Sequence, residues 1–166
     1  MTLSCEAYCV RRNVGHLRNN RVLTIWYAEP APGDIVWCRF PQDLPAPGQK
    51  PRPALVLKCG LVDDRPTVLV AYGTSKNTDL LYAGEFAIYP KDEPGYHRAG
   101  LSFATKFNLK KTVYLPYNNI WFGPPPEGSG VTPKLGELHP SLVKRLHAAA
   151  NVLTAAELEK LRGTEE

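Results

Sequence analysis

The chain lacks the sequence motifs of several large enzyme classes. Its 166 residues contain no Walker loop, no G-x-S-x-G motif, no H-E-x-x-H motif and no pair of carboxylates at an interpretable spacing. These absences argue against a P-loop nucleotide hydrolase, an α/β-hydrolase and a zincin protease.

The chain also has no long hydrophobic run. No apolar segment approaches the roughly 20 residues that a membrane-spanning helix requires. Residues 1–20 contain neither a compact apolar stretch nor an obvious cleavage site, so they do not resemble a signal peptide. We therefore expect a cytoplasmic protein.

Cysteine is scarce, with four residues in the whole chain. Cys38 and Cys59 lie inside apolar, strand-like runs, which is typical of small buried side chains with reduced thiols. Cys5 and Cys9 could bind a metal together with His16, but their spacing matches no standard zinc site and a fourth ligand is missing. We therefore expect no metal, no cofactor and a reducing compartment.

The excess of positive charge is small and unevenly distributed. The net charge is +4, and residues 1–23 hold four arginines against one glutamate, so the rest of the chain is close to neutral. This balance predicts no extended surface for polyanions, and any nucleic-acid site must be a local groove. The basic segment shows no clear apolar periodicity, so we expect residues 1–23 to form a flexible arm.

Sixteen prolines and 13 glycines separate many short apolar runs. Runs rich in β-branched and aromatic residues predict strands, at residues 35–40, 53–60, 67–75, 85–90, 101–109 and 111–117. The segments between them, at 41–51 and 91–100 in particular, are expected to be loops. Many short strands with long polar connections indicate a small barrel or a strongly bent sheet.

The last part of the chain has a different composition. Prolines and glycines after residue 123 predict a hinge, and apolar residues at helical spacing follow at Leu142, Val143, Leu146, Ala149 and Ala150. Thr154 and Glu157 predict the start of a second helix and Gly163 its end. The expected fold class is mainly β with peripheral helices, comprising an arm (1–23), a barrel (24–123) and a hinge with C-terminal helices (124–166).

Arg52 is the strongest candidate for a functional residue. It stands between Pro51 and Pro53, at the junction of a long loop and an apolar strand. The prolines fix their own φ angles, and Pro53 restricts Arg52 to an extended conformation, so the side chain leaves the backbone in a defined direction. A preorganised guanidinium is suited to a phosphate or to a pentavalent phosphorus transition state.

Two further segments could contribute polar groups to the same site. The third predicted strand ends in Gly73, which permits close backbone approach, followed by the hydroxyls of Thr74 and Ser75 and by Lys76. Consecutive strands often pair, but the sequence does not show whether Arg52 and Thr74 lie at the same end. Thr105 and Lys106 interrupt an apolar strand, which predicts a polar groove on one of its faces. Weaker candidates are His97 for catalysis and the aromatic residues Tyr114, Tyr117, Trp121 and Phe122, for which core packing is expected and base stacking is the alternative.

The order of these segments resembles the MazF/PemK (Kid) family of type II toxin–antitoxin toxins. The resemblance covers roughly residues 32–122 and depends on PGDIVWCRF, the long loop, KPRPALVL, VLVAYGTS and GLSFATKFNL. It implies an SH3-like barrel of the CcdB/MazF type, a homodimer, a cognate antitoxin and a metal-independent endoribonuclease acting on single-stranded RNA. Arg52 matches the family's catalytic arginine and Thr74 its active-site hydroxyl, with Ser75 as the alternative. We expect Ser75, Lys76, Thr105 and Lys106 to bind substrate.

The resemblance implies that the ribose 2′-hydroxyl attacks the adjacent phosphorus and leaves a cyclic phosphate. Because arginine stays protonated, Arg52 is expected to stabilise charge in the transition state rather than to act as a base. Two other functions stay open on the same barrel, since fold does not fix function. One is a noncatalytic module that binds nucleic acid or protein. The other is a gyrase poison of the CcdB type, against which the polar C-terminal sequence LRGTEE argues.

Overall fold

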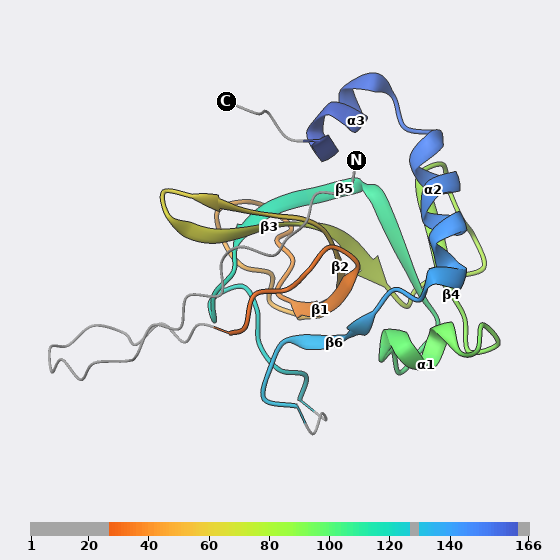
Figure 1. Cartoon of the computed structure of the whole chain (residues 1–166), viewed down its shortest axis with the longest axis horizontal. Helices are drawn as coiled ribbons and strands as arrows, with labels where there is room; N and C mark the ends of the chain where they lie inside the picture. Colours follow the sequence, from red (N-terminus) through yellow and green to blue (C-terminus); the bar gives the residue numbers. More distant parts are fainter. Residues whose placement is uncertain (1–26, 127–129, 163–166) are drawn as a thin grey trace, which may run out of the picture.

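The computed structural model describes residues 27–126 and 130–162. They form one antiparallel sheet with the strand order β4-β5-β3-β2-β1-β6 and a few short helices (Figure 1). The strands are β1 (Asp34–Cys38), β2 (Arg52–Val62), β3 (Arg65–Thr74), β4 (Glu85–Ile88), β5 (Thr105–Pro116) and β6 (Lys134–Glu137). The helices are α1 (Gly95–Ala99), the 3-10 turn η1 (Pro140–Leu142), α2 (Val143–Asn151) and α3 (Ala155–Arg162). The expected mainly β fold with peripheral helices is confirmed.

The sheet is not a closed barrel, which corrects the expected small barrel in this respect. The order places β4 and β6 at opposite edges, and the two do not pair. Each edge instead meets a helix: α2 packs beside β4, and α1 packs beside β6 (Figure 1). At Gly136 of β6 an added Cβ would lie 2.2 Å from the carbonyl oxygen of Arg98, so α1 and β6 are in backbone contact.

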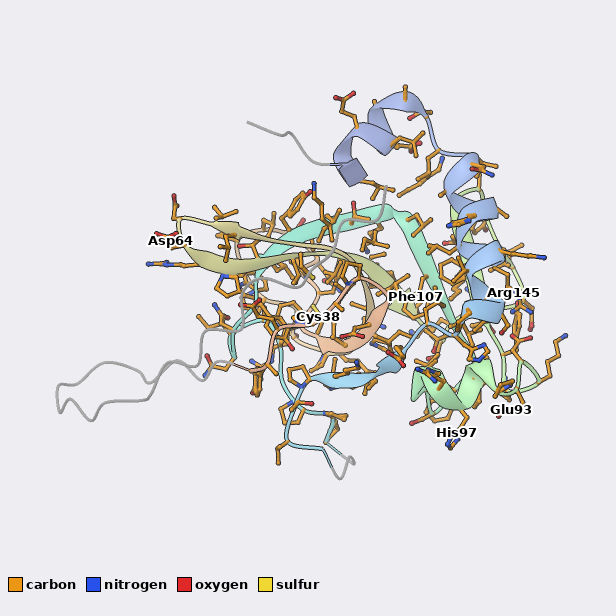
Figure 2. The ribbon with its side chains drawn as sticks, in the orientation of Figure 1. Cys38, Asp64, Glu93, His97, Phe107 and Arg145 are labelled. Carbon is orange, nitrogen blue, oxygen red and sulfur yellow. The ribbon has the colours of Figure 1, made fainter. Side chains whose placement is uncertain are left out.

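Both faces of the sheet are buried, because successive residues of the central strands enter different cores. One core contains Ile35, Leu55, Ala71, Phe86 and Phe107, together with residues of η1 and α2. The second core contains Val36, Cys38, Val56, Val70, Tyr117, Trp121 and Phe122. Figure 2 labels Phe107 and Cys38, which belong to the first and the second core respectively. Double burial explains why the central strands contain continuous apolar runs rather than alternating apolar and polar residues.

Several expected boundaries differ in the structure. The fifth and sixth predicted strands are one strand, β5, and Phe103, placed in the fifth, precedes it and is exposed. The expected loop at 91–100 contains α1. The strand at Lys134–Glu137 was not predicted, because four residues with two charged ends show too little periodicity. The expectations for the arm at 1–23, for Cys5, Cys9 and His16, and for Gly163 lie outside the described residues.

The expectations for the other cysteines and for the C-terminal helices agree with the structure. Cys38 is a free, fully buried thiol, and burial raises its pKa; Cys59 is half-buried, and its thiol donates to the carbonyl oxygen of Pro30 at 3.1 Å. Leu142 and Ala149 pack into the first core, so the apolar stripe of α2 is a packing surface. The backbone N–H of Thr154 donates to Glu157 Oε2 at 2.7 Å, and that of Glu157 donates back to Thr154 Oγ1 at 3.3 Å, which is a capping box. None of the helices among the described residues is long and apolar enough to cross a bilayer.

A salt bridge between Arg145 of α2 and Asp92 connects α2 to the loop that follows β4. Arg145, labelled in Figure 2, donates to both oxygens of Asp92, at 2.6 and 2.8 Å, and to the carbonyl oxygen of Ala87 at 3.0 Å. The hydrogen bonds from Arg145, assisted by one from the Tyr89 N–H, hold the pKa of Asp92 below its usual value. The same contacts raise the pKa of Arg145. Arg145 thus donates a hydrogen bond to a backbone carbonyl of the edge strand β4 and connects this strand to α2.

The Asp92 contact predicts a defined pH dependence of stability. A carboxyl whose pKa is lower in the folded state stabilises the fold above its unfolded pKa of about 3.9, and this contribution disappears as pH falls through the folded value. Asp92→Asn is therefore expected to lower the free energy of unfolding by about 1–2 kcal/mol at neutral pH. Urea unfolding should show this difference shrinking as the pH is lowered below about 3.9. The exposed Asp79→Asn is the control; a difference for Asp92→Asn that stays constant down to strongly acidic pH would contradict this account.

Candidate functional site

The start of β2 and the end of β3 lie at the same end of one hairpin. The two strands are antiparallel, with Ala54 opposite Tyr72, and the turn that joins them carries Asp64 at the far end (Figure 2). An added Cβ at Gly73 would lie 2.3 Å from the carbonyl oxygen of Pro53, so this position has no room for a side chain. Arg52 therefore begins its strand at the end where Thr74 finishes the neighbouring one.

A pocket of about 400 Å³ opens at this end of the sheet. The loop between β1 and β2 forms one wall, and residues of β2, β3 and β5 form the other. Its lining comprises Phe40, Pro41, Gln42, Asp43, Ala46, Pro47, Gly48, Gln49, Lys50, Arg52, Tyr72 and Lys111. The long loop that the sequence analysis connected with function is thus part of a concave site that contains Arg52.

The pocket carries more positive than negative charge. Arg52, Lys50 and Lys111 line it against a single carboxylate, Asp43. None of these three cations takes part in a salt bridge within the part of the chain that the structure describes. Cations grouped in a concave site without counter-ions favour an anionic ligand.

The ring of Tyr72 is in contact with two of these cations. The guanidinium carbon of Arg52 is 5.6 Å from the centroid of the Tyr72 ring, and Lys111 Nζ is 4.1 Å from it. Phe40 meets the same ring edge-to-face, with 5.2 Å between centroids. Cation–π contact of this kind holds a positive side chain in place without neutralising it.

The structure places Thr74 beside the pocket but not in its lining. Thr74 lies two residues after Tyr72 in β3, so the two side chains leave the same face of the sheet. Thr74 Oγ1 accepts a hydrogen bond from the Lys76 N–H at 3.2 Å, which fixes the turn after β3. Ser75 and Lys76 are exposed in that turn and are also absent from the lining.

Thr105 and Lys106, which the sequence predicts to bind substrate, make internal contacts in this structure, and their role towards a substrate stays a prediction. Thr105 is buried and donates its hydroxyl to the carbonyl oxygen of Phe103 at 2.9 Å. Lys106 lies opposite Thr74 in the sheet, but its ammonium is buried against Glu85 at 2.8 Å. The polar residues that interrupt this strand therefore serve an internal contact.

The weaker candidates also have definite places. His97 lies exposed on α1 (Figure 2) and does not line the pocket. Tyr117, Trp121 and Phe122 belong to the second core, which confirms the packing role expected for them, whereas Tyr114 is 42% exposed. Among the residues with described structure, no group of three or more histidines, cysteines or carboxylates could hold a metal ion.

Two lining residues, Tyr72 and Lys111, were not predicted from the sequence. Tyr72 reads as one more apolar residue of a buried strand. Lys111 reaches the pocket because the pairing of β3 and β5 is irregular: Ala71 lies opposite Thr112, whereas Tyr72 lies opposite Asn108. No local signal in the sequence predicts that interruption.

Comparison with known proteins identifies the family. Residues 31–115, more than half of the chain, match the family described as PemK-like, MazF-like toxin of type II toxin-antitoxin system. No match was found among curated proteins. The matched region contains Arg52, Thr74 and Lys111 and ends within β5. The chain therefore belongs to the MazF/PemK family of type II toxins, and this membership implies an antitoxin as its partner.

Proposed function

We propose that the protein is an endoribonuclease that cleaves single-stranded RNA at the pocket containing Arg52. The observation that carries the proposal is the position of Arg52: it is half-buried in a concave site, held over Tyr72 and free of any salt bridge to a described residue. Membership of a toxin family that resembles known endoribonucleases supports the same conclusion.

The proposed reaction is an internal transesterification. The ribose 2′-oxygen forms a bond to the adjacent phosphorus and loses its proton to solvent, while the bond from phosphorus to the 5′-oxygen breaks and that oxygen gains a proton. The products carry a 2′,3′-cyclic phosphate and a 5′-hydroxyl. Negative charge on the nonbridging oxygens grows in the transition state, and the fixed guanidinium of Arg52 stabilises it.

Thr74 is the proposed second donor to a nonbridging oxygen. Its oxygen accepts the hydrogen bond from Lys76, and no acceptor among the described residues takes the hydroxyl proton. A threonine hydroxyl can accept and donate at once, so the proton of Thr74 can point towards a phosphate oxygen. Ser75 and Lys76, in the adjoining exposed turn, are proposed to contact the flanking nucleotides.

The proposed assembly follows from the family and from the pocket. The protein is proposed to form a homodimer, as the resemblance to the family implies. The cations of the pocket, which have no carboxylate partner among the described residues, suit an extended acidic segment of the antitoxin as well as RNA. Occupation of the same pocket by an acidic peptide would block access of RNA. Antitoxin binding and RNA binding are therefore proposed to be mutually exclusive.

The decisive test is cleavage of single-stranded RNA by the purified protein in EDTA. We expect fragments with 2′,3′-cyclic phosphate and 5′-hydroxyl ends, identified by mass spectrometry. If the RNA stays intact while the protein still arrests bacterial growth, the nuclease proposal is wrong and the noncatalytic binding function is favoured. Cleavage that stops with EDTA and returns with a divalent cation would contradict the proposed chemistry.

A further inference from the structure

The irregular part of β5 presents two neighbouring lysines in different environments. Leu109, Lys110 and Lys111 stand between the paired positions Asn108 and Thr112. The side chain of Asn108 organises this bulge, since its Oδ1 accepts from the N–H groups of Lys110 at 2.9 Å and of Lys111 at 3.2 Å. Asn108 Nδ2 in turn donates to Glu85 Oε1 at 3.1 Å, which fixes the orientation of the amide.

The bulge directs Lys110 towards α3 and Lys111 towards the pocket. Lys110 Nζ lies 3.5 Å from Glu157 of α3 and so has a carboxylate partner. Lys111 Nζ lies 4.1 Å from the centroid of Tyr72 and 5.9 Å from that of Phe40, in the lining of the pocket. Lys111 is therefore a cation placed against aromatic rings beside Arg52, in a site whose one carboxylate, Asp43, makes no salt bridge to it.

We propose that Lys111 binds the backbone phosphate next to the one held by Arg52, and that Asn108 is the positioning residue that directs Lys111 there. This inference rests on the proposed function, because it names a second contact of the same RNA substrate. Each phosphodiester carries one negative charge, so a single phosphate would leave two of the three lining cations without a partner. Two successive phosphates match the charge of the two cations at Tyr72 more closely.

The test measures binding without cleavage. A fluorescein-labelled 2′-O-methyl oligoribonucleotide of randomised sequence cannot undergo attack by the 2′-oxygen, so its affinity can be followed by anisotropy at several salt concentrations. Lys111→Met keeps most of the side-chain stem over Tyr72 and removes the charge. We expect several-fold weaker binding at low salt and a salt slope reduced by about 0.7, the value for one lost contact to a single-stranded phosphate. Lys111→Arg should restore both.

Lys110→Met is the matched control, because it removes the adjacent lysine of the same bulge. We expect it to bind the oligonucleotide as the wild type does. In cleavage assays Lys111→Met should raise KM and leave kcat nearly unchanged, as expected for a contact made equally in the ground and transition states. Asn108→Ala should reproduce the weaker binding of Lys111→Met.

The possible outcomes separate the two proposals. If Lys111→Met and Lys110→Met bind equally well with equal salt slopes, Lys111 only packs on Tyr72 and the inference is wrong, even where wild-type protein cleaves RNA. If the wild type binds the oligonucleotide with a slope that depends on Lys111 but leaves unmodified RNA intact, the inference holds and the nuclease proposal fails. A wild-type protein that binds no oligonucleotide would overturn both.

Discussion

Replacing Arg52 by alanine is expected to reduce kcat for RNA cleavage by about 100- to 1000-fold, the usual effect of removing one preorganised donor to a developing oxyanion. The guanidinium is fixed by Pro51 and Pro53, by the pairing of Arg52 with Cys38 of β1, and by Tyr72 at 5.6 Å. Since Arg52 forms no salt bridge with a described residue, its positive charge is available to stabilise the phosphate. Single-turnover cleavage of RNA by purified protein measures this loss directly.

The same substitution should have little effect on folding. Strand pairing at Arg52 uses backbone atoms, which alanine keeps, and the lost cation–π contact is worth about 0.5–1 kcal/mol. Arg65→Ala is a matched control, because Arg65 also precedes a proline, but it stands at the opposite end of the β2–β3 hairpin and is exposed. Equal cleavage rates for Arg52→Ala and Arg65→Ala would remove Arg52 from the mechanism. Arg52→Lys should recover only part of the activity, because lysine keeps the charge and loses the planar fork.

The sequence predicts the central part of the fold well, because its signals there are local. The apolar runs of β1, β2 and β3 are continuous since both sheet faces are buried, and their ends are marked by proline and glycine. Thr154 and Glu157 predict their capping box for the same reason: both partners lie within one helical turn. The edges of the sheet are harder to predict. β6 and α1 are short, and each is stabilised by backbone contact with the other, which involves residues far apart in sequence.

Part of the candidate site can also be predicted from local signals in the sequence. Arg52 and the loop before it are recognised from the two prolines and the strand that follows, and Gly73 from the hydroxyls after it. Tyr72 and Lys111 are not recognised, because their role depends on a register change between β3 and β5. The pairing of Lys106 with the buried Glu85 was not predicted, because a lysine that interrupts an apolar strand looks the same in the sequence whether its partner is a substrate or a glutamate.

Replacing Glu85 by glutamine is the substitution with the largest expected effect on stability. The side chains of Glu85 and Lys106 are each 8% exposed, and their charged atoms lie 2.8 Å apart. Glu85 also accepts hydrogen bonds from the Tyr82 N–H and from Asn108 Nδ2, both at 3.1 Å. Without the carboxylate, the Lys106 ammonium stays buried and uncompensated, which costs about 3–5 kcal/mol. Urea unfolding followed by circular dichroism measures this loss. The control is Glu137→Gln, because the Glu137 side chain is 39% exposed and its pairs with Arg98 and Lys134 are each worth at most about 1 kcal/mol.

The same pair connects stability to the loop between β3 and β4. Lys106 Nζ donates to the carbonyl oxygen of Leu80 at 2.8 Å, so the ion pair holds the segment that begins immediately after Thr74. The double variant Glu85→Leu with Lys106→Met should recover much of the stability lost in Glu85→Gln, because it leaves no unpaired buried charge. Lys106→Met alone should lower the free energy of unfolding more than it changes the affinity for RNA. If a Lys106 variant folds as stably as the wild type but binds RNA weakly, Lys106 contacts the substrate, and the purely structural role described here is wrong.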